Sequence, residues 1–277
     1  MTDQEEARSR LGARLRELRL RAGLTGAQLS AQTGWSQPKI SRIETSKTMP
    51  TLEDLGTWAR LTGATAEEAD ELVTLAIQAA TSATSWRILH QLGLAQTQQQ
   101  YGELELAAHT IRIFQPVCIP GLLQTAEYAR RVMLSGNPSA QTDIAEAVAK
   151  RMQRQAILYD QAKQFEFIMT EAAVRWRPGP VELMRAQFDH LASIATLPNV
   201  ALGTIPLDIE SSATYRHAFV VLEGEETVIT VETFAAELQI RDPADIATYH
   251  QYLDRLRQMT VWADEAVAYL RSLQAGR

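Results

Sequence analysis

The sequence has little cysteine and no long apolar run. Cys118 is the only cysteine among 277 residues, so no intrachain disulfide can form and no Cys/His cluster is available for zinc. No apolar run approaches the roughly 18 residues needed to span a bilayer, and the acidic start MTDQEEARSR is unlike the basic start of a signal peptide. These absences predict a cytoplasmic protein with no metal site, membrane segment or disulfide.

Motifs of common enzymes are also missing. The chain has no P-loop, G-x-G-x-x-G, G-x-S-x-G or H-E-x-x-H pattern, so phosphate, dinucleotide, acyl-transfer and zinc-hydrolase chemistry lack support. Glu105 and His109 are one helical turn apart, but no third metal ligand accompanies them. We therefore expect a protein that is not an enzyme and that uses no cofactor.

The composition is typical of a soluble globular protein that is long enough for two domains. Hydrophobic residues make up 45% of the chain and charged residues 22%, which allows a sizeable core. The net charge of -6 argues weakly against a nucleic-acid partner, but it is unevenly distributed. Residues 8–47 contain nine Lys or Arg against two Asp or Glu, a local charge of +7. A basic region near the N-terminus thus precedes an acidic remainder.

Five helices are predicted in the N-terminal part of the chain. Apolar residues recur at helical spacing up to Gly23, which ends the first helix. Capping patterns open three more helices at Thr25 with Gln28, at Ser36 and at Thr51. A fifth helix is expected over residues 66–80. We assign residues 1–82 to a compact all-helical domain.

The stretch WSQPKISRIE, residues 35–44, predicts the second helix of a helix-turn-helix unit, which reads the DNA major groove. With Ile40 and Ile43 buried, the helical period turns the polar residues outward. As bidentate partners, Gln37 suits adenine and Arg42 suits guanine. Phosphates are the expected partners of Lys39, Lys47 and the Ser36 hydroxyl. The predicted DNA-binding residues are Ser36, Gln37, Pro38, Lys39, Ser41, Arg42 and Lys47.

Pro38 lies in the first turn of this helix. The backbone N–H groups there have no intrahelical partner, so a proline does not break the helix. Free N–H groups at a helix N-terminus can bind phosphate, and Pro38 removes one of them. We therefore expect sequence specificity to depend on Gln37 and Arg42.

The stretch LRELRLRAGLTGAQLSAQTGWSQPKISRIETSKTMPTLEDL resembles the Xre/Cro-type helix-turn-helix family over about a fifth of the chain. The resemblance implies that Arg19 pairs with Glu44 and ties the first helix to the reading helix. It also implies base or phosphate contacts at Gln37, Arg42 and Lys47.

Two positions depart from the family pattern. Gly26 replaces a frequent glutamine, which removes one implied phosphate contact, and Thr45-Ser46 replaces the usual Asn-Gly. The alternative to DNA reading is a basic helical bundle that binds a protein and whose charges are merely solvated. For Arg8, Arg10, Arg14 and Arg16 taken singly, a solvated helix face is the favoured interpretation.

Residues 83–277 are predicted to form a larger α+β domain. Four short β-branched or aromatic runs read as strands: FEFIMTE, NVALGTIP, HAFVVLE and TVITVETF. Helices are expected over residues 86–110, 122–133, 140–161 and 181–195, and one or two long helices over residues 243–273. The expected fold class is mainly α with α+β: a five-helix domain, then a domain with a small sheet of about four strands.

The stretch YGELELAAHTIRIFQPVCIPGLLQTAEYARRVM, with the later RMQRQAIL, FEFIMTEAAVRW and IPL, resembles a domain of actinobacterial regulators. Similar proteins include WhiJ-type developmental regulators and antitoxin-like regulators, often encoded beside a small acidic partner protein. The resemblance covers nearly all of residues 85–275. It implies a transcription factor controlled by a partner or a signal, and we carry over no catalytic residue.

The segment IPGLLQT within this stretch is expected to form a structural corner, because Pro120 fixes its backbone and Gly121 permits a tight turn. A ligand or partner contact is the alternative. In that case the candidate pocket residues are Glu105, Gln124, Tyr128 and Arg151. Cys118 is expected to be buried core rather than a redox sensor.

Three functions remain open from the sequence. The leading hypothesis is a sequence-specific transcriptional regulator that binds double-stranded operator DNA as a homodimer and associates with the nucleoid when bound. The second is an antitoxin-like module that captures a small acidic partner protein, with autoregulatory DNA binding. The third places a small-molecule effector site in the α+β domain.

Overall fold

The computed structural model describes residues 3–85, 94–136, 143–233, 236–262, 265–266 and 268–269. Its contacts divide the chain into two compact units. The first contains Met1–Ala83 with Glu225–Val228 and Leu238–Tyr249, and the second contains Thr84–Gly224, Ile229–Glu237 and His250–Arg277. We describe each unit by itself. Of the helices described, none is long and apolar enough to cross a membrane.

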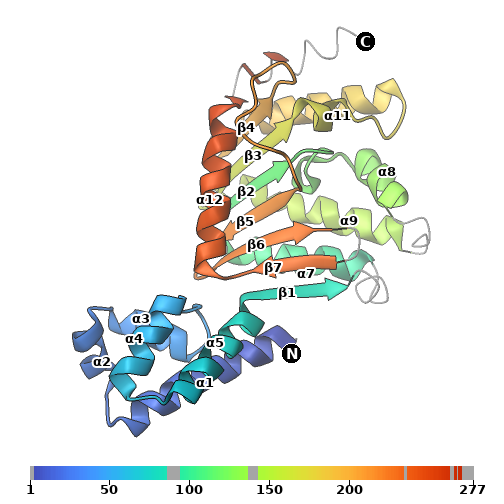
Figure 1. Cartoon of the computed structure of the whole chain (residues 1–277). Helices are drawn as coiled ribbons and strands as arrows, with labels where there is room; N and C mark the ends of the chain where they lie inside the picture. The colour runs from blue at the N-terminus through green and yellow to red at the C-terminus, as the bar shows by residue number, and fades with distance from the viewer. Residues whose placement is uncertain are drawn as a thin grey trace. The chain divides into compact units, whose positions relative to one another are not determined.

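The first unit contains the five predicted helices (Figure 1). They are α1 (Asp3–Arg21), α2 (Gly26–Thr33), α3 (Gln37–Glu44), α4 (Leu52–Thr62) and α5 (Ala66–Ala80). Thr25 and Thr51 form capping boxes, and Gly34 and Gly63 end helices in the left-handed conformation with φ of 74° and 64°. The short helices therefore begin and end where their caps predict.

A single apolar core holds these helices together. Leu15, Leu18, Leu29 and Trp58 are completely buried in it. The indole nitrogen of Trp58 donates a hydrogen bond of 3.1 Å to the Leu15 carbonyl, so this buried polar group is satisfied. This packing fixes the helices against one another.

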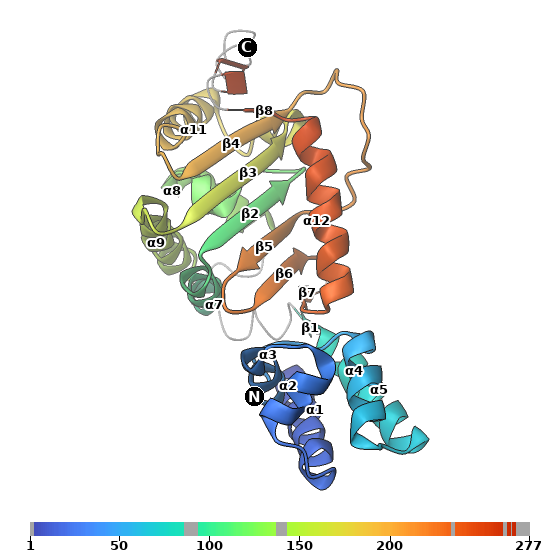
Figure 2. The ribbon, with the colours of Figure 1, turned by 90° about the vertical axis from the view of Figure 1, so that its left-hand side faces the viewer.

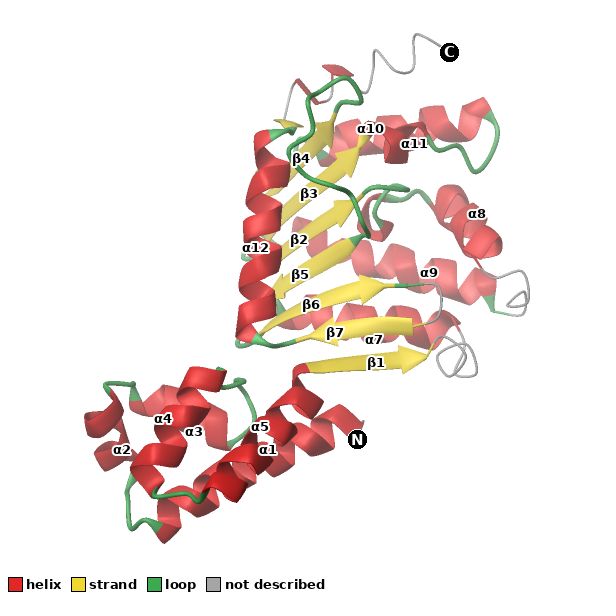
Figure 3. Cartoon of the chain, viewed as in Figure 1, coloured by secondary structure: helices red, strands yellow, loops and turns green. Residues whose placement is uncertain are grey.

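The strands form one mixed sheet (Figure 3) with the order β1-β7-β6-β5-β2-β3-β4-β8. Their bounds are β1 (Thr81–Ser85), β2 (Thr110–Gln115), β3 (Gln164–Thr170), β4 (Val200–Ile205), β5 (Phe219–Glu223), β6 (Thr227–Glu232), β7 (Ala236–Ile240) and β8 (Val261–Trp262). Strands β2, β3 and β4 run parallel, whereas β5 pairs antiparallel with β2. Seven strands have five to seven residues and β8 has two.

The prediction of about four strands was therefore too low. The four predicted strands are present as β3, β4, β5 and β6. The others were missed because β1 (TSATS) is polar and β7 (AELQI) is short, so pairing with neighbours rather than local pattern defines them. The helix predicted over residues 86–110 ends where β2 begins, and the rest of β2 was left unassigned although its buried residues nearly alternate.

Helices cover both faces of the second unit's sheet (Figure 2). One face carries α7 (Leu94–Ala107), α8 (Ala126–Gly136), α9 (Ile144–Arg154) and α11 (Val181–Ile194). On the other face, the end of α12 (Pro243–Gln258) packs so that Arg257 pairs with Glu166 of β3 at 2.7 Å. The short helices are η1 (Gly121–Leu123), η2 (Gln155–Tyr159) and α10 (Glu171–Arg175). The mostly helical chain with a mixed sheet confirms the fold class in outline.

Some predicted helix bounds were wrong. The helix predicted over residues 140–161 ends at Arg154 and continues as η2, and the one predicted from residue 243 ends at Gln258 before β8. Apolar spacing alone could not show these ends. Parts of the predicted helices, at residues 86–93, 140–142, 263–264, 267 and 270–273, lie outside the described residues.

Candidate nucleic-acid interface and cavity

Helix α3 presents one polar face to solvent. Ile40 and Ile43 are 2% and 1% exposed and anchor its underside in the core. The exposed residues on and beside it are Ser36, Gln37, Pro38, Ser41, Arg42 and Lys47. Six of the seven predicted DNA-binding residues are thus accessible.

The start of α3 is fixed by its cap and by the preceding turn. Ser36 Oγ accepts a hydrogen bond of 3.3 Å from the Lys39 N–H, and Pro38 lies in the first turn without interrupting the helix. Ser30 Oγ donates to the Trp35 carbonyl at 2.5 Å, while Thr33 Oγ1 accepts from the Trp35 N–H at 3.1 Å. These bonds set the direction in which α3 leaves α2.

The end of α3 is tied to α1 by Arg19 and Glu44. Arg19 Nε and Nη2 lie 2.5 and 2.8 Å from the two Glu44 carboxylate oxygens. Both side chains are about nine-tenths buried, with 10% and 9% exposed. Arg19 Nη1 also donates to the Leu24 carbonyl at 2.7 Å, and the hydrogen bond with Glu44 raises the pKa of Arg19. This bidentate pair fixes the position of the exposed face.

Lys39 is half-buried, unlike the other predicted contacts. Lys47 is exposed, although its Nζ lies 3.8 Å from Glu225 Oε2. The Nζ of Lys39 lies 2.8 Å from Asp54 Oδ1 and 4.4 Å from the centre of the Trp35 ring. Asp54 in turn caps α4 by accepting the Thr51 N–H at 3.1 Å. Lys39 is half-buried and already engaged, so DNA would have to compete with Asp54 for its ammonium group.

Sequence reasoning did not identify the close approach of α1 to the end of α3. A Cβ at Gly12 would lie 2.7 Å from Ser46 Oγ and 2.8 Å from the Glu44 carbonyl oxygen. Ser46 has φ of 61°, which glycine adopts more easily, and its Oγ donates to the Arg8 carbonyl at 2.9 Å. Gly12, a glycine inside the predicted first helix, was the sequence signal for this close approach.

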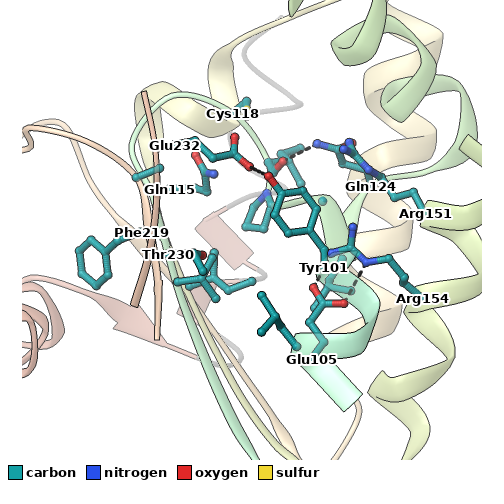
Figure 4. Close-up of a pocket in the computed structure, with 18 of the residues that line it drawn as sticks. Tyr101, Glu105, Gln115, Cys118, Gln124, Arg151, Arg154, Phe219, Thr230 and Glu232 are labelled. Carbon is teal, nitrogen blue, oxygen red and sulfur yellow. Dashed lines mark hydrogen bonds and ion pairs between the residues drawn. The ribbon is translucent and has the colours of Figure 1, made fainter. Parts of the chain in front are cut away.

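The second unit contains a cavity of about 140 Å³ between α7, α9, η1 and the sheet (Figure 4). Three of the four candidate pocket residues line it: Glu105 from α7, Gln124 after η1 and Arg151 from α9. Tyr128 is fully buried behind this lining, where its hydroxyl accepts the Ile119 N–H at 3.4 Å. Burial raises the pKa of Tyr128.

The IPGLLQT segment both turns the chain and forms a wall of the cavity. Gln124 Nε2 donates to the Ile119 carbonyl at 2.7 Å and closes the turn. Gln155 Nε2 donates to the Gln124 carbonyl at 2.7 Å and holds the turn against η2. The predicted corner is therefore present, and it also forms part of the cavity wall.

Two arginines of α9 lie side by side at this wall and share Gln98 Oε1 as an acceptor, but their other partners differ. Arg154 Nε pairs with Glu105 Oε2 at 2.9 Å. Arg151 Nη1 donates to Gln124 Oε1 at 2.7 Å, and Arg151 Nε donates to Gln98 Oε1 at 3.1 Å. Burial, followed by repulsion from Arg154, lowers the pKa of Arg151 to about 10, so it remains charged at neutral pH.

Sequence reasoning missed Tyr101 and Glu232, two further polar residues of the cavity, because they are far apart in the chain. Tyr101 donates a hydrogen bond of 3.0 Å to Glu232 Oε1, and the Arg154 guanidinium lies 5.2 Å from the centre of the Tyr101 ring. Cys118 is half-buried in the lining, and burial raises the pKa of its thiol to about 11. Within the described ranges, no group of three or more His, Cys, Asp or Glu residues could hold a metal ion.

Comparison with known proteins gives two family matches. Residues 10–72 match a helix-turn-helix domain, and residues 98–272 match a domain of unknown function (DUF5753). A search of curated proteins finds no match. The helix-turn-helix match supports a DNA-binding regulator.

Among solved structures, a similar one is that of TrmBL2, an archaeal chromatin protein with a novel mode of DNA binding. The similarity covers 86% of this chain and 87% of that chain, with 10% sequence identity and a TM-score of 0.33. This likeness is too weak to establish a shared fold. By its match over most of its length, the chain belongs to the family of the domain of unknown function (DUF5753), here preceded by a helix-turn-helix domain.

Proposed function

We propose that the protein is a sequence-specific, non-enzymatic transcriptional regulator that binds operator DNA through α3. The observation that carries this proposal is the exposed polar face of α3 within a helix-turn-helix domain. Arg42 is exposed on this face and makes no ion pair with any residue in the described part of the chain. Its guanidinium is thus available for a base edge.

The roles of the exposed residues follow from their chemistry. Gln37 can form two hydrogen bonds with adenine, and Arg42 can form two with guanine. Each such bidentate pair discriminates against the wrong base by about 1 to 3 kcal/mol. The hydroxyls of Ser36 and Ser41 and the ammonium group of Lys47 can contact phosphates. Because Lys39 is held by Asp54, we assign it a supporting part at the helix start.

The proposal includes binding as a homodimer, since one such module has a small footprint on DNA. Two copies would read half-sites about 34 to 36 Å apart on one face of the duplex, or at a multiple of that spacing. The resemblance to Xre/Cro-type and WhiJ-type regulators supports this arrangement. Control of binding would reside in the domain that follows the helix-turn-helix.

A genome-wide binding footprint of the native protein tests the proposal. We expect discrete sites that share an inverted repeat with one helical turn between half-sites. On such a site, Lys47→Ala should weaken binding to all sequences alike and reduce the salt dependence by about one phosphate contact. Uniform coverage without enriched sites would show that α3 reads no sequence.

A further inference from the structure

Arg151 stands out in the second unit because its charge has no ion-pair partner. Its hydrogen-bond acceptors are the amide oxygens of Gln98 and Gln124. No described carboxylate lies within ion-pair distance of it, and Nη2 has no hydrogen bond to any described residue. The guanidinium packs against Gly121, where a Cβ would meet its Cζ at 3.6 Å. A cation is therefore held in place with part of its bonding capacity unused.

The rest of the cavity is largely apolar. Its lining includes Leu104, Ile113, Leu122, Val132, Phe219 and Leu222. A cavity of about 150 Å³ with apolar walls is large enough for benzene, so this space of about 140 Å³ fits a small apolar group. A mostly apolar chamber with a few convergent polar groups is the usual form of a small-molecule site.

The two carboxylates that line the cavity have different partners. Glu105 pairs with Arg154, and Glu232 accepts the Tyr101 hydroxyl. Glu232 keeps its charge, because the Tyr101 hydroxyl is neutral, but it forms no ion pair with Arg151 within the described residues. An anionic ligand would supply the direct ion-pair partner that Arg151 lacks, and a carboxylate matches the geometry of a guanidinium.

We propose that this cavity binds a small monocarboxylate, with its carboxylate on Arg151 and its apolar part among the aliphatic and aromatic side chains. Gln124 holds the guanidinium toward the ligand, and Gln98 holds it from the other side. The site lies within the second unit and does not depend on the DNA-binding proposal.

Cys118 provides a built-in probe, because it is the only cysteine of the chain and lines this cavity. The full chain is treated with the small neutral reagent methyl methanethiosulfonate at about pH 9, where Arg151 stays mostly charged and some Cys118 thiolate is present. The probes are benzoate and 3-methylbutanoate, each compared with its neutral amide.

We expect each acid, and neither amide, to slow modification of Cys118 in a saturable way. By mass action, an acid at ten times its dissociation constant should slow it about tenfold. Arg151→Gln should abolish this protection, whereas Arg130→Gln, which removes an exposed arginine paired with Glu127, should leave it intact.

The comparison of acid with amide uses the native chain, so it remains decisive even if Arg151→Gln does not fold. Failure of both acids to protect Cys118, or equal protection by acids and amides, would overturn the proposal. Full protection in a folded Arg151→Gln variant would overturn it as well. No DNA is present in this assay, so these outcomes leave the role of α3 unaffected.

Discussion

The α3 surface and the cavity of the second unit share one arrangement: each combines a paired arginine with an unpaired one. In the first, Arg19 is locked to Glu44 and Arg42 is left exposed. In the second, Arg154 is locked to Glu105, and Arg151 faces a cavity of about 140 Å³ with only amide partners. The paired arginine holds the surrounding helices in position, and the unpaired one is the residue that we propose contacts the ligand. The surroundings of the unpaired arginine are the basis on which we propose a DNA duplex as the partner of Arg42 and a small molecule as the partner of Arg151.

The largest expected effect comes from breaking a paired arginine. Glu44→Ala should lower the free energy of unfolding of the helical domain by about 3 to 5 kcal/mol, because it leaves the Arg19 charge buried and unpaired. Removing the exposed Arg42 should cost less than about 0.5 kcal/mol. Denaturant unfolding followed by circular dichroism compares the two variants. Equal losses of stability would contradict the distinction between the structural, paired Arg19 and the exposed, unpaired Arg42.

Close packing of α1 against the end of α3 predicts an intermediate effect. Gly12→Ala places a methyl group 2.8 Å from the Glu44 carbonyl oxygen and should destabilise the domain by about 1 to 3 kcal/mol. The matched control is Gly56→Ala within α4, where no atom lies within 4 Å of the new methyl group. That control should stabilise the domain by about 0.5 to 1 kcal/mol. Stabilisation by both changes would show that α1 does not hold α3 this closely.

The smallest effect concerns exposed carboxylates. Hydrogen bonds with Arg21 and the Thr65 backbone lower the pKa of Glu68 from 4.5 to about 2, and those with Arg130 and Arg131 do the same for Glu127. Since the folded pKa is the lower one, the contribution is present above about pH 4.5 and is lost as the pH falls toward 2. Melting temperatures of Glu68→Gln and the native chain should therefore differ at pH 6 and converge near pH 2.

Glu127→Gln is the matched control for this pH series. Glu127 bonds arginines of its own helix, whereas Glu68 joins α5 to arginines of α1. A pair within one helix contributes less to tertiary stability, so this variant should show a smaller difference at pH 6. A larger shift for Glu127→Gln than for Glu68→Gln would contradict this order.

The helical domain could be predicted from sequence because its signals are local. Thr25, Ser36 and Thr51 cap helices whose bounds follow within one or two residues. Pro38 was correctly allowed in the first turn. The engagement of Lys39 was missed, because Asp54 is fifteen positions away and reaches Lys39 only through tertiary packing.

The second unit was less predictable because its contacts join distant segments. Tyr101 and Glu232 are 131 positions apart, so no spacing rule connects them. Strands β1 and β7 lack a local apolar pattern and exist through their neighbours in the sheet. Glu105, Gln124 and Arg151 were nevertheless singled out, yet only the structure shows that the three line one cavity.

The most direct test of the central claim is the affinity of Arg42→Ala for its operator at fixed salt, compared with Arg60→Ala. Arg60 is an exposed arginine of the same domain, but it lies on α4 rather than α3. We predict that Arg42→Ala weakens operator binding by about 1 to 3 kcal/mol and relaxes specificity at one base pair, while Arg60→Ala changes little. Native affinity in Arg42→Ala, or an equal loss in Arg60→Ala, would contradict the assignment of α3 as the reading helix.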